Sequence, residues 1–178
     1  MCFFFEDEAV FQQSGTFTRT WAEINKGTVV NSEPVRRSMK TFGAVSLEHK
    51  PKWHFRFVER FNAVTFLSFL KQIVRQYPGR KVLMVLDNVR YHHAKLVAEW
   101  VAANADRIEL HFLPAYSPDF NPIEQIWRVT KRSATHNRHF PTLDALHQTL
   151  SRKFNRFQGN PSSLRGAIGD HLAMLRTA

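Results

Sequence analysis

Cysteine is almost missing from this sequence, since Cys2 is the single one among 178 residues. One cysteine cannot form an internal disulfide, and its rarity excludes a zinc site built on several thiolates. Such usage is typical of a protein that works in a reducing cytosol. Long apolar runs are missing too, because no stretch approaches the ~20 consecutive apolar residues of a membrane helix. The opening segment also lacks the positively charged start of a signal peptide.

Negative charge is scarce. The sequence has 15 Asp and Glu against 25 Lys and Arg, which gives a formal net charge of +10. This excess predicts a polyanionic partner, with nucleic acid as the first candidate, while a basic surface that binds nothing is the alternative. The hydrophobic fraction of 43% and the 16 Phe residues indicate one packed domain rather than a disordered chain.

Hydrophobic periodicity predicts alternating strands and helices. Short apolar or alternating segments predict strands at residues 2–5, 39–47, 53–58, 81–86 and 108–113. Helical spacing predicts helices at residues 62–77, 94–103, 142–157 and 164–175. The middle of the chain therefore follows the order β–α–β–α–β, which is typical of an α/β fold.

Three consecutive acids, Glu6, Asp7 and Glu8, interrupt the first apolar segment. On a strand, Asp7 shares a face with Phe5, whereas Glu6 and Glu8 point to the other face. Acids inside an apolar run are costly to bury unless a cation or water meets them. A solvated turn between two short strands is the alternative.

The segment from residue 113 to residue 128 predicts a loop that turns into a helix. Asn121 suits the N-cap of this helix, and Pro122 suits its first position because no N–H partner is needed there. Glu124 then lies in the first turn, so its carboxylate is held close to the junction between the loop and the helix. The alternative is an ordinary capping box, in which Glu124 bonds an unpaired backbone N–H.

A third acid, Asp87, follows the strand predicted at residues 81–86, and ligands of open α/β sheets bind at this edge. If the first and fourth strands are neighbours, Asp7, Asp87 and Glu124 can converge. Carboxylates held together raise one another's pKa, and hard divalent cations such as Mg²⁺ or Mn²⁺ relieve the repulsion. Two such ions clamp the attacking and leaving oxygens of a phosphoryl displacement.

Other polar residues accompany these acids. His92, five residues after Asp87, is a candidate to orient a water or a phosphate, or to support Asp87. The alternative is a histidine with only a local hydrogen bond at a helix entry. Three cations follow Glu124 and are the first choice for DNA contacts because of their proximity: Arg128, Lys131 and Arg132.

Three motifs together give a resemblance to a known family. They are Glu6-Asp7-Glu8 after an aromatic strand, Leu86-Asp87-Asn88-x-x-x-His92, and Leu113-Pro114-x-Tyr116-Ser117-Pro118-x-x-Asn121-Pro122-Ile123-Glu124-x-x-Trp127. With them, the chain resembles the catalytic domain of DDE transposases of the Tc/mariner superfamily, in its bacterial insertion-sequence branch. The third motif is highly specific, and the three together span nearly the whole chain.

The resemblance implies a ribonuclease H-like fold, a mixed five-stranded sheet with helices on both faces. It makes Asp7, Asp87 and Glu124 the catalytic, metal-binding triad for two divalent cations, Mg²⁺ or Mn²⁺. Residues expected to support them are Asn88, His92 and Asn121. The implied reaction is cleavage of double-stranded DNA at element ends and transfer of the freed 3′-hydroxyl into target DNA, usually at a TA dinucleotide. The implied setting is a homodimer on DNA in the bacterial cytosol, associated with the nucleoid.

Domain organisation departs from the family in one respect. Family members carry helix-turn-helix DNA-binding domains before the first acid, whereas six residues precede Asp7 here. We therefore expect residues 1–178 to be a single catalytic domain, with residues 136–178 as its helical extension. A split gene, a truncated copy or a catalytic fragment would each give this arrangement. The alternatives to transposition are a ribonuclease H-like nuclease without strand transfer and an inactive DNA-binding remnant.

Overall fold

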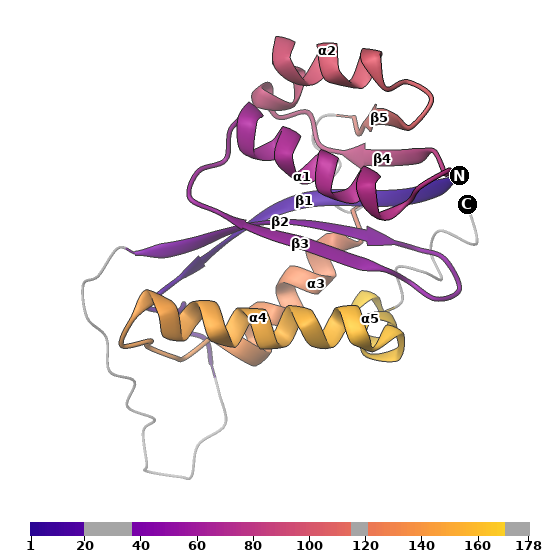
Figure 1. Cartoon of the computed structure of the whole chain (residues 1–178). Helices are drawn as coiled ribbons and strands as arrows, with labels where there is room; N and C mark the ends of the chain where they lie inside the picture. Colours follow the sequence, from indigo (N-terminus) through magenta and orange to yellow (C-terminus); the bar gives the residue numbers. More distant parts are fainter. Residues whose placement is uncertain (20–36, 115–120, 170–178) are drawn as a thin grey trace, which may run out of the picture.

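The computed structural model describes residues 1–19, 37–114 and 121–169. One sheet of five strands forms the centre, in the order β3-β2-β1-β4-β5 (Figure 1). β1 runs antiparallel to β2 and parallel to β4, which itself pairs parallel with β5. The strands are β1 (Cys2–Gln12), β2 (Ser38–Ser46), β3 (Trp53–Val58), β4 (Val82–Leu86) and β5 (Ile108–Phe112).

Helices cover both faces of this sheet (Figure 1). On one face lie α1 (Ala63–Gln76), the short 3-10 helix η1 (Arg90–His93) and α2 (Lys95–Ala103). On the other face lie α3 (Ile123–Thr130), its continuation as a π-helical turn η3 (Lys131–Thr135), α4 (Leu143–Gly159) and α5 (Pro161–Ile168). None of the helices in the described ranges is both long and apolar enough to span a membrane.

The alternation of side chains along β1 divides the core into two layers. Phe5, Ala9 and Phe11 pack on the α3–α4 side, where the ring of Phe11 makes edge contacts with the rings of Trp127 and Phe154. Cys2 and Phe4 pack on the α1 side, together with Phe42, Phe66 and Phe69. β1 is therefore buried on both faces, and any polar side chain in its middle must enter one of these two layers.

The strands and helices expected from periodicity are confirmed, with shifts of a few residues at their ends. β1 continues through the three acids to Gln12, so the alternative of a turn there is wrong. α3 begins at Ile123, directly after Pro122. The last helix ends at Ile168, and the part predicted at 170–175 lies outside the described residues.

Candidate active site

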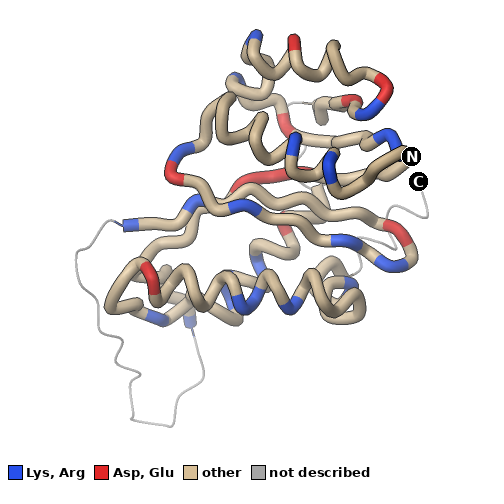
Figure 2. The backbone as a smooth tube through the Cα atoms, viewed as in Figure 1, with Lys and Arg blue, Asp and Glu red and all other residues tan. Residues whose placement is uncertain are grey.

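Two neighbouring strands bring the first two acids together. Phe5 of β1 pairs with Val85 of β4, and Asp7 and Asp87 each follow two residues later. Carboxylate oxygens of Asp7, Glu8 and Asp87 lie within 4.8 Å of one another. Figure 2 shows the red acidic segment of β1 in the middle of the sheet, with blue segments on the surrounding elements. The convergence of Asp7 and Asp87 therefore follows from the parallel pairing of their strands.

Asp7 enters the layer of α3. Its Oδ2 accepts a hydrogen bond of 2.9 Å from the indole Nε1–H of Trp127. The pKa of Asp7 is raised from 3.8 to about 7, mainly by burial and also by the charges of Glu8 and Glu124, while the Trp127 bond acts in the opposite direction. Without a cation, this carboxyl group therefore holds its proton close to neutral pH.

Glu124 stands at the start of α3, which Asn121 fixes to the central strand. The buried Asn121 side chain donates from Nδ2 to the Glu6 carbonyl oxygen at 2.9 Å, and its Oδ1 accepts from the Ile123 N–H at 3.2 Å. Pro122 adopts helical angles of φ −62° and ψ −17°, which suits a helix start. The loop-to-helix junction is thus held rigidly against β1 by one amide side chain.

The carboxylate of Glu124 is exposed and lies outside the group formed by Asp7, Glu8 and Asp87. It is still close enough for its charge to raise the pKa of Asp7. Glu124 lies three residues before Trp127, so both side chains project from the same side of α3. Among the described residues, the Glu124 carboxylate accepts no hydrogen bond from a backbone N–H at the start of α3. The capping-box alternative therefore does not describe this structure.

His92 lies behind the acids and contacts both strands. Its Nδ1 is 3.2 Å from the Asp87 carbonyl oxygen and 3.4 Å from Asp87 Oδ1, and its Nε2 is 3.3 Å from Glu8 Oε1. Burial alone lowers the pKa of His92, but the bonds to Asp87 and the interaction with Glu8 outweigh it and raise the pKa to about 9. The alternative, in which His92 makes only a local hydrogen bond, does not account for its contact with Glu8 on β1.

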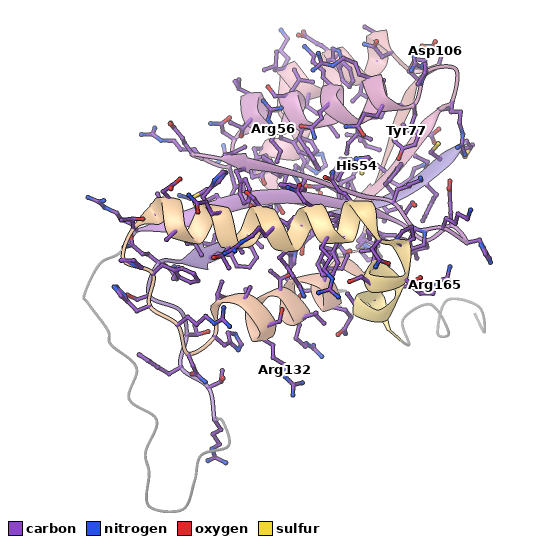
Figure 3. The ribbon with its side chains drawn as sticks, turned by 60° about the horizontal axis from the view of Figure 1, so that its bottom comes forward. His54, Arg56, Tyr77, Asp106, Arg132 and Arg165 are labelled. Atoms are coloured by element: carbon purple, nitrogen blue, oxygen red, sulfur yellow. The ribbon has the colours of Figure 1, made fainter. Side chains whose placement is uncertain are left out.

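The remaining candidates lie farther out. Asn88 is exposed and its Oδ1 contacts His93 Nε2, so it joins β4 to η1 rather than contacting the acids. Arg128 and Arg132 are exposed, and Lys131 is half-buried at the start of the π-helical turn. Figure 3 shows Arg132 projecting away from the body of the protein.

Sequence reasoning missed three residues that shape the site. Glu8 joins Asp7 and Asp87, and Trp127 donates to Asp7. Gly43 is paired with Asp7 across β1 and β2, and a Cβ there would meet the Trp53 and Trp127 rings at 2.5 Å and 2.6 Å. The first and third motifs contain Glu8 and Trp127 without assigning them a role, and no sequence signal pointed to Gly43.

The donor set fits divalent cations with oxygen ligands. Three carboxylates from Asp7, Glu8 and Asp87 face one another, and the buried Oε1 of Glu8 has His92 Nε2 at 3.3 Å but no well-aligned hydrogen bond among the described residues. All-oxygen sets of this kind suit Mg²⁺ and Mn²⁺ better than softer metals. A cation there would offset the desolvation and mutual repulsion of the acids.

The sequence is similar to those of two curated proteins from mobile elements. The chain is 26% identical over 160 residues to the Tc3 transposase of Caenorhabditis elegans, a match that covers 82% of this chain and 46% of that protein. It is also 26% identical over 77 residues to an uncharacterized 39 kDa protein of insertion element IS630 from Shigella sonnei, covering 43% of this chain and 22% of that protein. The chain thus matches less than half the length of these two curated relatives.

The fold is similar to that of the Mos1 transposase. In the Mos1 strand transfer complex, the match has a TM-score of 0.65 and 18% sequence identity, and it covers 97% of this chain and 52% of the Mos1 chain. The ribonuclease H-like fold and the resemblance to Tc/mariner transposases are thereby confirmed. The family model described as DDE superfamily endonuclease matches residues 3–147. The chain therefore belongs to the DDE superfamily endonucleases.

Proposed function

We propose that this chain is the catalytic domain of a Tc/mariner-type transposase, which cuts double-stranded DNA at element ends and joins the freed 3′-hydroxyl to target DNA. One observation carries the proposal: Asp7 and Asp87 meet at the junction of two parallel strands, beside the helix start that bears Glu124. The family membership and the similarity to the Mos1 strand transfer complex support the same reaction.

In this proposal, Asp7, Asp87 and Glu124 hold two divalent cations, Mg²⁺ or Mn²⁺. When bound, the cations activate the attacking oxygen and stabilise the charge on the phosphate. Solved Mos1 paired-end complexes are described with Mn and with Mg, which supports the choice of metal. Trp127 orients Asp7 by its hydrogen bond, so the carboxylate keeps a free oxygen for the metal.

Supporting residues keep the acids in place. Asn121 ties the start of α3 to the β1 backbone, and His92 ties the Asp87 backbone to Glu8. Asn88 supports the acids indirectly, through the contact of its Oδ1 with His93 Nε2 in η1. Loss of such ligand-supporting bonds typically costs 10–100-fold in metal affinity or activity.

DNA binding is assigned to the basic residues next to the acids. Arg128 and Arg132 lie one and two turns after Glu124 and are exposed on α3 and its continuation. Because i, i+4 residues share a helix face, a phosphate backbone held by these two side chains passes close to Glu124. Lys131 is the third proposed contact.

The wider assembly is also a proposal. We propose that residues 1–178 form one catalytic domain, with residues 136–178 as the C-terminal helical extension of that domain. The active assembly would be a homodimer that holds two element ends, and it would act on DNA in the bacterial cytosol, associated with the nucleoid. Relatives described as paired-end complexes support the dimeric assembly.

A joining assay tests the reaction. A labelled duplex with a pre-cut 3′-end is incubated with the protein, a supercoiled plasmid and Mg²⁺ or Mn²⁺, and covalent products are resolved by size. The wild-type chain is expected to link the duplex to the plasmid, and Glu124→Gln to lose this product. Glu99→Gln, an exposed carboxylate on α2, is the matched control and should join normally.

The outcomes separate the competing functions. Nicking of the plasmid without joined product would identify a nuclease and overturn strand transfer. DNA binding without either reaction would identify an inactive remnant. Joining at the wild-type rate by Glu124→Gln would remove Glu124 from the proposed site.

A further inference from the structure

The face of β1 opposite Asp7 carries polar atoms that have no hydrogen-bond partner. The Glu6 side chain is fully buried, and neither of its carboxylate oxygens has a partner among the described residues. The same holds for Oε1 of Glu8 and for Nε2 of the buried His92. Burying an unpaired carboxylate is one of the costliest arrangements in a protein, so such a group must either take up a proton or meet a compensating positive charge.

These unpartnered atoms point at one another. Nε2 of His92 lies 3.3 Å from Glu8 Oε1 and 4.0 Å from Glu6 Oε2. One ligand atom from each of the three residues lies within 4.8 Å of the others. A small contraction brings all three to the distance that separates neighbouring ligands of a metal ion, which binds them at about 2.0–2.2 Å.

The other nitrogen of His92 completes a recognisable arrangement. Nδ1 lies 3.2 Å from the carbonyl oxygen of Asp87 and donates its proton there, so Nε2 is the nitrogen that can bind a metal once the ring releases its second proton. Metal-bound histidines nearly always donate their second N–H to a carbonyl or carboxylate in this way. The ring of His92 is fixed by Phe66 and Tyr91, with ring centroids at 4.2 Å and 4.6 Å.

We propose that Glu6, Glu8 and His92 form a second cation site, which takes a borderline transition metal such as Zn²⁺ and adjoins the catalytic cluster of Asp7 and Asp87. The ligand type argues for this metal, because an imidazole nitrogen suits Zn²⁺ whereas Mg²⁺ prefers oxygen alone. Glu8 belongs to both groups and joins the two sites.

The site would have a positioning role. A cation held by Glu6, Glu8 and His92 fixes η1 against β1, and His92 in turn holds the backbone of Asp87. Zn²⁺ at this place would therefore stabilise the protein without contacting DNA. The inference does not depend on the proposed transposition reaction, since it concerns metal affinity and stability alone.

Internal neutralisation is the rival explanation. Burial and the neighbouring acids raise the pKa of Glu6, and His92 has a raised pKa of about 9, so a neutral Glu6 beside a charged His92 would balance the group without metal. The two explanations differ in one measurable property, because only a metal site binds Zn²⁺ with a stoichiometry of one.

Calorimetric titration of tag-free protein with Zn²⁺, in millimolar Mg²⁺ that competes for the all-oxygen cluster, tests the site. One tight equivalent per chain is expected for the wild type. Glu6→Gln and His92→Gln should each weaken it by about tenfold or more. His93→Gln, at the adjacent exposed histidine, and Asp7→Asn, on the opposite face of β1, should keep it.

Circular dichroism establishes that each variant is folded, and a second readout needs no variant. Co²⁺ added to the wild-type chain should give the intense visible absorption of a cobalt ion with an imidazole ligand and low coordination number, displaced by Zn²⁺. A wild-type chain without this absorption and without a tight Zn²⁺ equivalent would overturn the proposal. Unchanged Zn²⁺ affinity in folded Glu6→Gln and His92→Gln would overturn it equally.

Discussion

Glu6 and Asp7 are neighbours on β1, but their carboxylates enter opposite layers of the protein. Asp7 meets the indole N–H of Trp127 and lies beside Asp87. The carboxylate of Glu6 has no hydrogen-bond partner among the described residues, although its backbone carbonyl accepts a bond from the Asn121 side chain. One strand therefore supplies acids to two environments, and only the α3 side provides a dedicated donor.

The largest effect is expected from Asp7→Asn on the α3 face. The substitution keeps the shape of the side chain and its contact with Trp127 but removes the charge proposed to hold a metal. Loss of several kcal/mol of charge stabilisation corresponds to a fall in the joining rate on the order of 10³-fold. A joining rate within a few-fold of the Glu99→Gln control would contradict the assignment.

The acids also make metal-free stability depend on pH. Because the pKa of Asp7 is raised to about 7, its contribution to stability is full below its ordinary value of 3.8 and is lost as the pH rises through about 7. His92 acts in the same direction, because its pKa is raised from 6.5 to about 9. Its contribution to stability is full below pH 6.5 and is lost as the pH rises through about 9. We expect Asp7 alone to lower the free energy of unfolding on the order of 3 kcal/mol between pH 5 and pH 8.

Urea unfolding in a chelating buffer measures this dependence. Asp7→Asn should flatten the curve between pH 5 and pH 7, and added Mg²⁺ should flatten it in the wild type. Stability that rises with pH over this range would mean that the acids are not desolvated as the structure has them.

Gly43→Ala tests the contact that lets Trp127 approach Asp7. The added Cβ would lie within 2.7 Å of both Trp rings, so we expect a loss of roughly 1–3 kcal/mol in unfolding free energy. Gly166→Ala in α5 is the matched control, since nothing lies within 4 Å of its Cβ position. It should gain about 0.5–1 kcal/mol from helix propensity. Equal effects of the two substitutions would refute the close packing at Gly43.

Trp127→Phe removes the donor to Asp7 while it keeps an aromatic ring. The lost bond should cost about 1 kcal/mol in stability and raise the pKa of Asp7 further, so that the pH-dependent loss of metal-free stability moves to higher pH. Trp53→Phe is the control, because the buried Trp53 indole N–H has no partner among the described residues. The same pH dependence of metal-free unfolding in both variants would argue against the role of Trp127.

The smallest effect is expected from Arg132, an exposed residue of η3 that contacts neither group of acids on β1. Arg132→Ala should weaken DNA binding by a few-fold and lower the slope of log affinity against log salt by about one unit. Lys95→Ala, an exposed cation on α2, is the control. Fluorescence anisotropy over a salt series measures both, and an unchanged slope for Arg132→Ala would remove it from the interface.

The sequence predicted the fold well because each element is locally consistent. The 62–77 helix has an Asn62–Thr65 capping box and an apolar face, and the central strands alternate or are wholly apolar. Asp87 could be assigned to a site because it follows a buried parallel strand. Glu124 could be placed at a helix start because Asn121 and Pro122 precede it.

The contacts that build the site could not be predicted in the same way. The bond from Asn121 to the Glu6 carbonyl and the bond from Trp127 to Asp7 join segments more than a hundred residues apart. They depend on the exact seating of α3 on β1, which Gly43 permits. Periodicity reports which face of an element is apolar, but it does not report which atoms meet across two elements.

The central claim is that Asp7, Asp87 and Glu124 share divalent cations. Anomalous diffraction from crystals of the chain grown with Mn²⁺ and a duplex bearing a 3′-end tests it most directly. The account predicts anomalous peaks between Asp7 and Asp87, with the Glu124 carboxylate turned inward as a ligand. Well-ordered DNA with no peak between Asp7 and Asp87, or with Glu124 directed away from the metal, would contradict it.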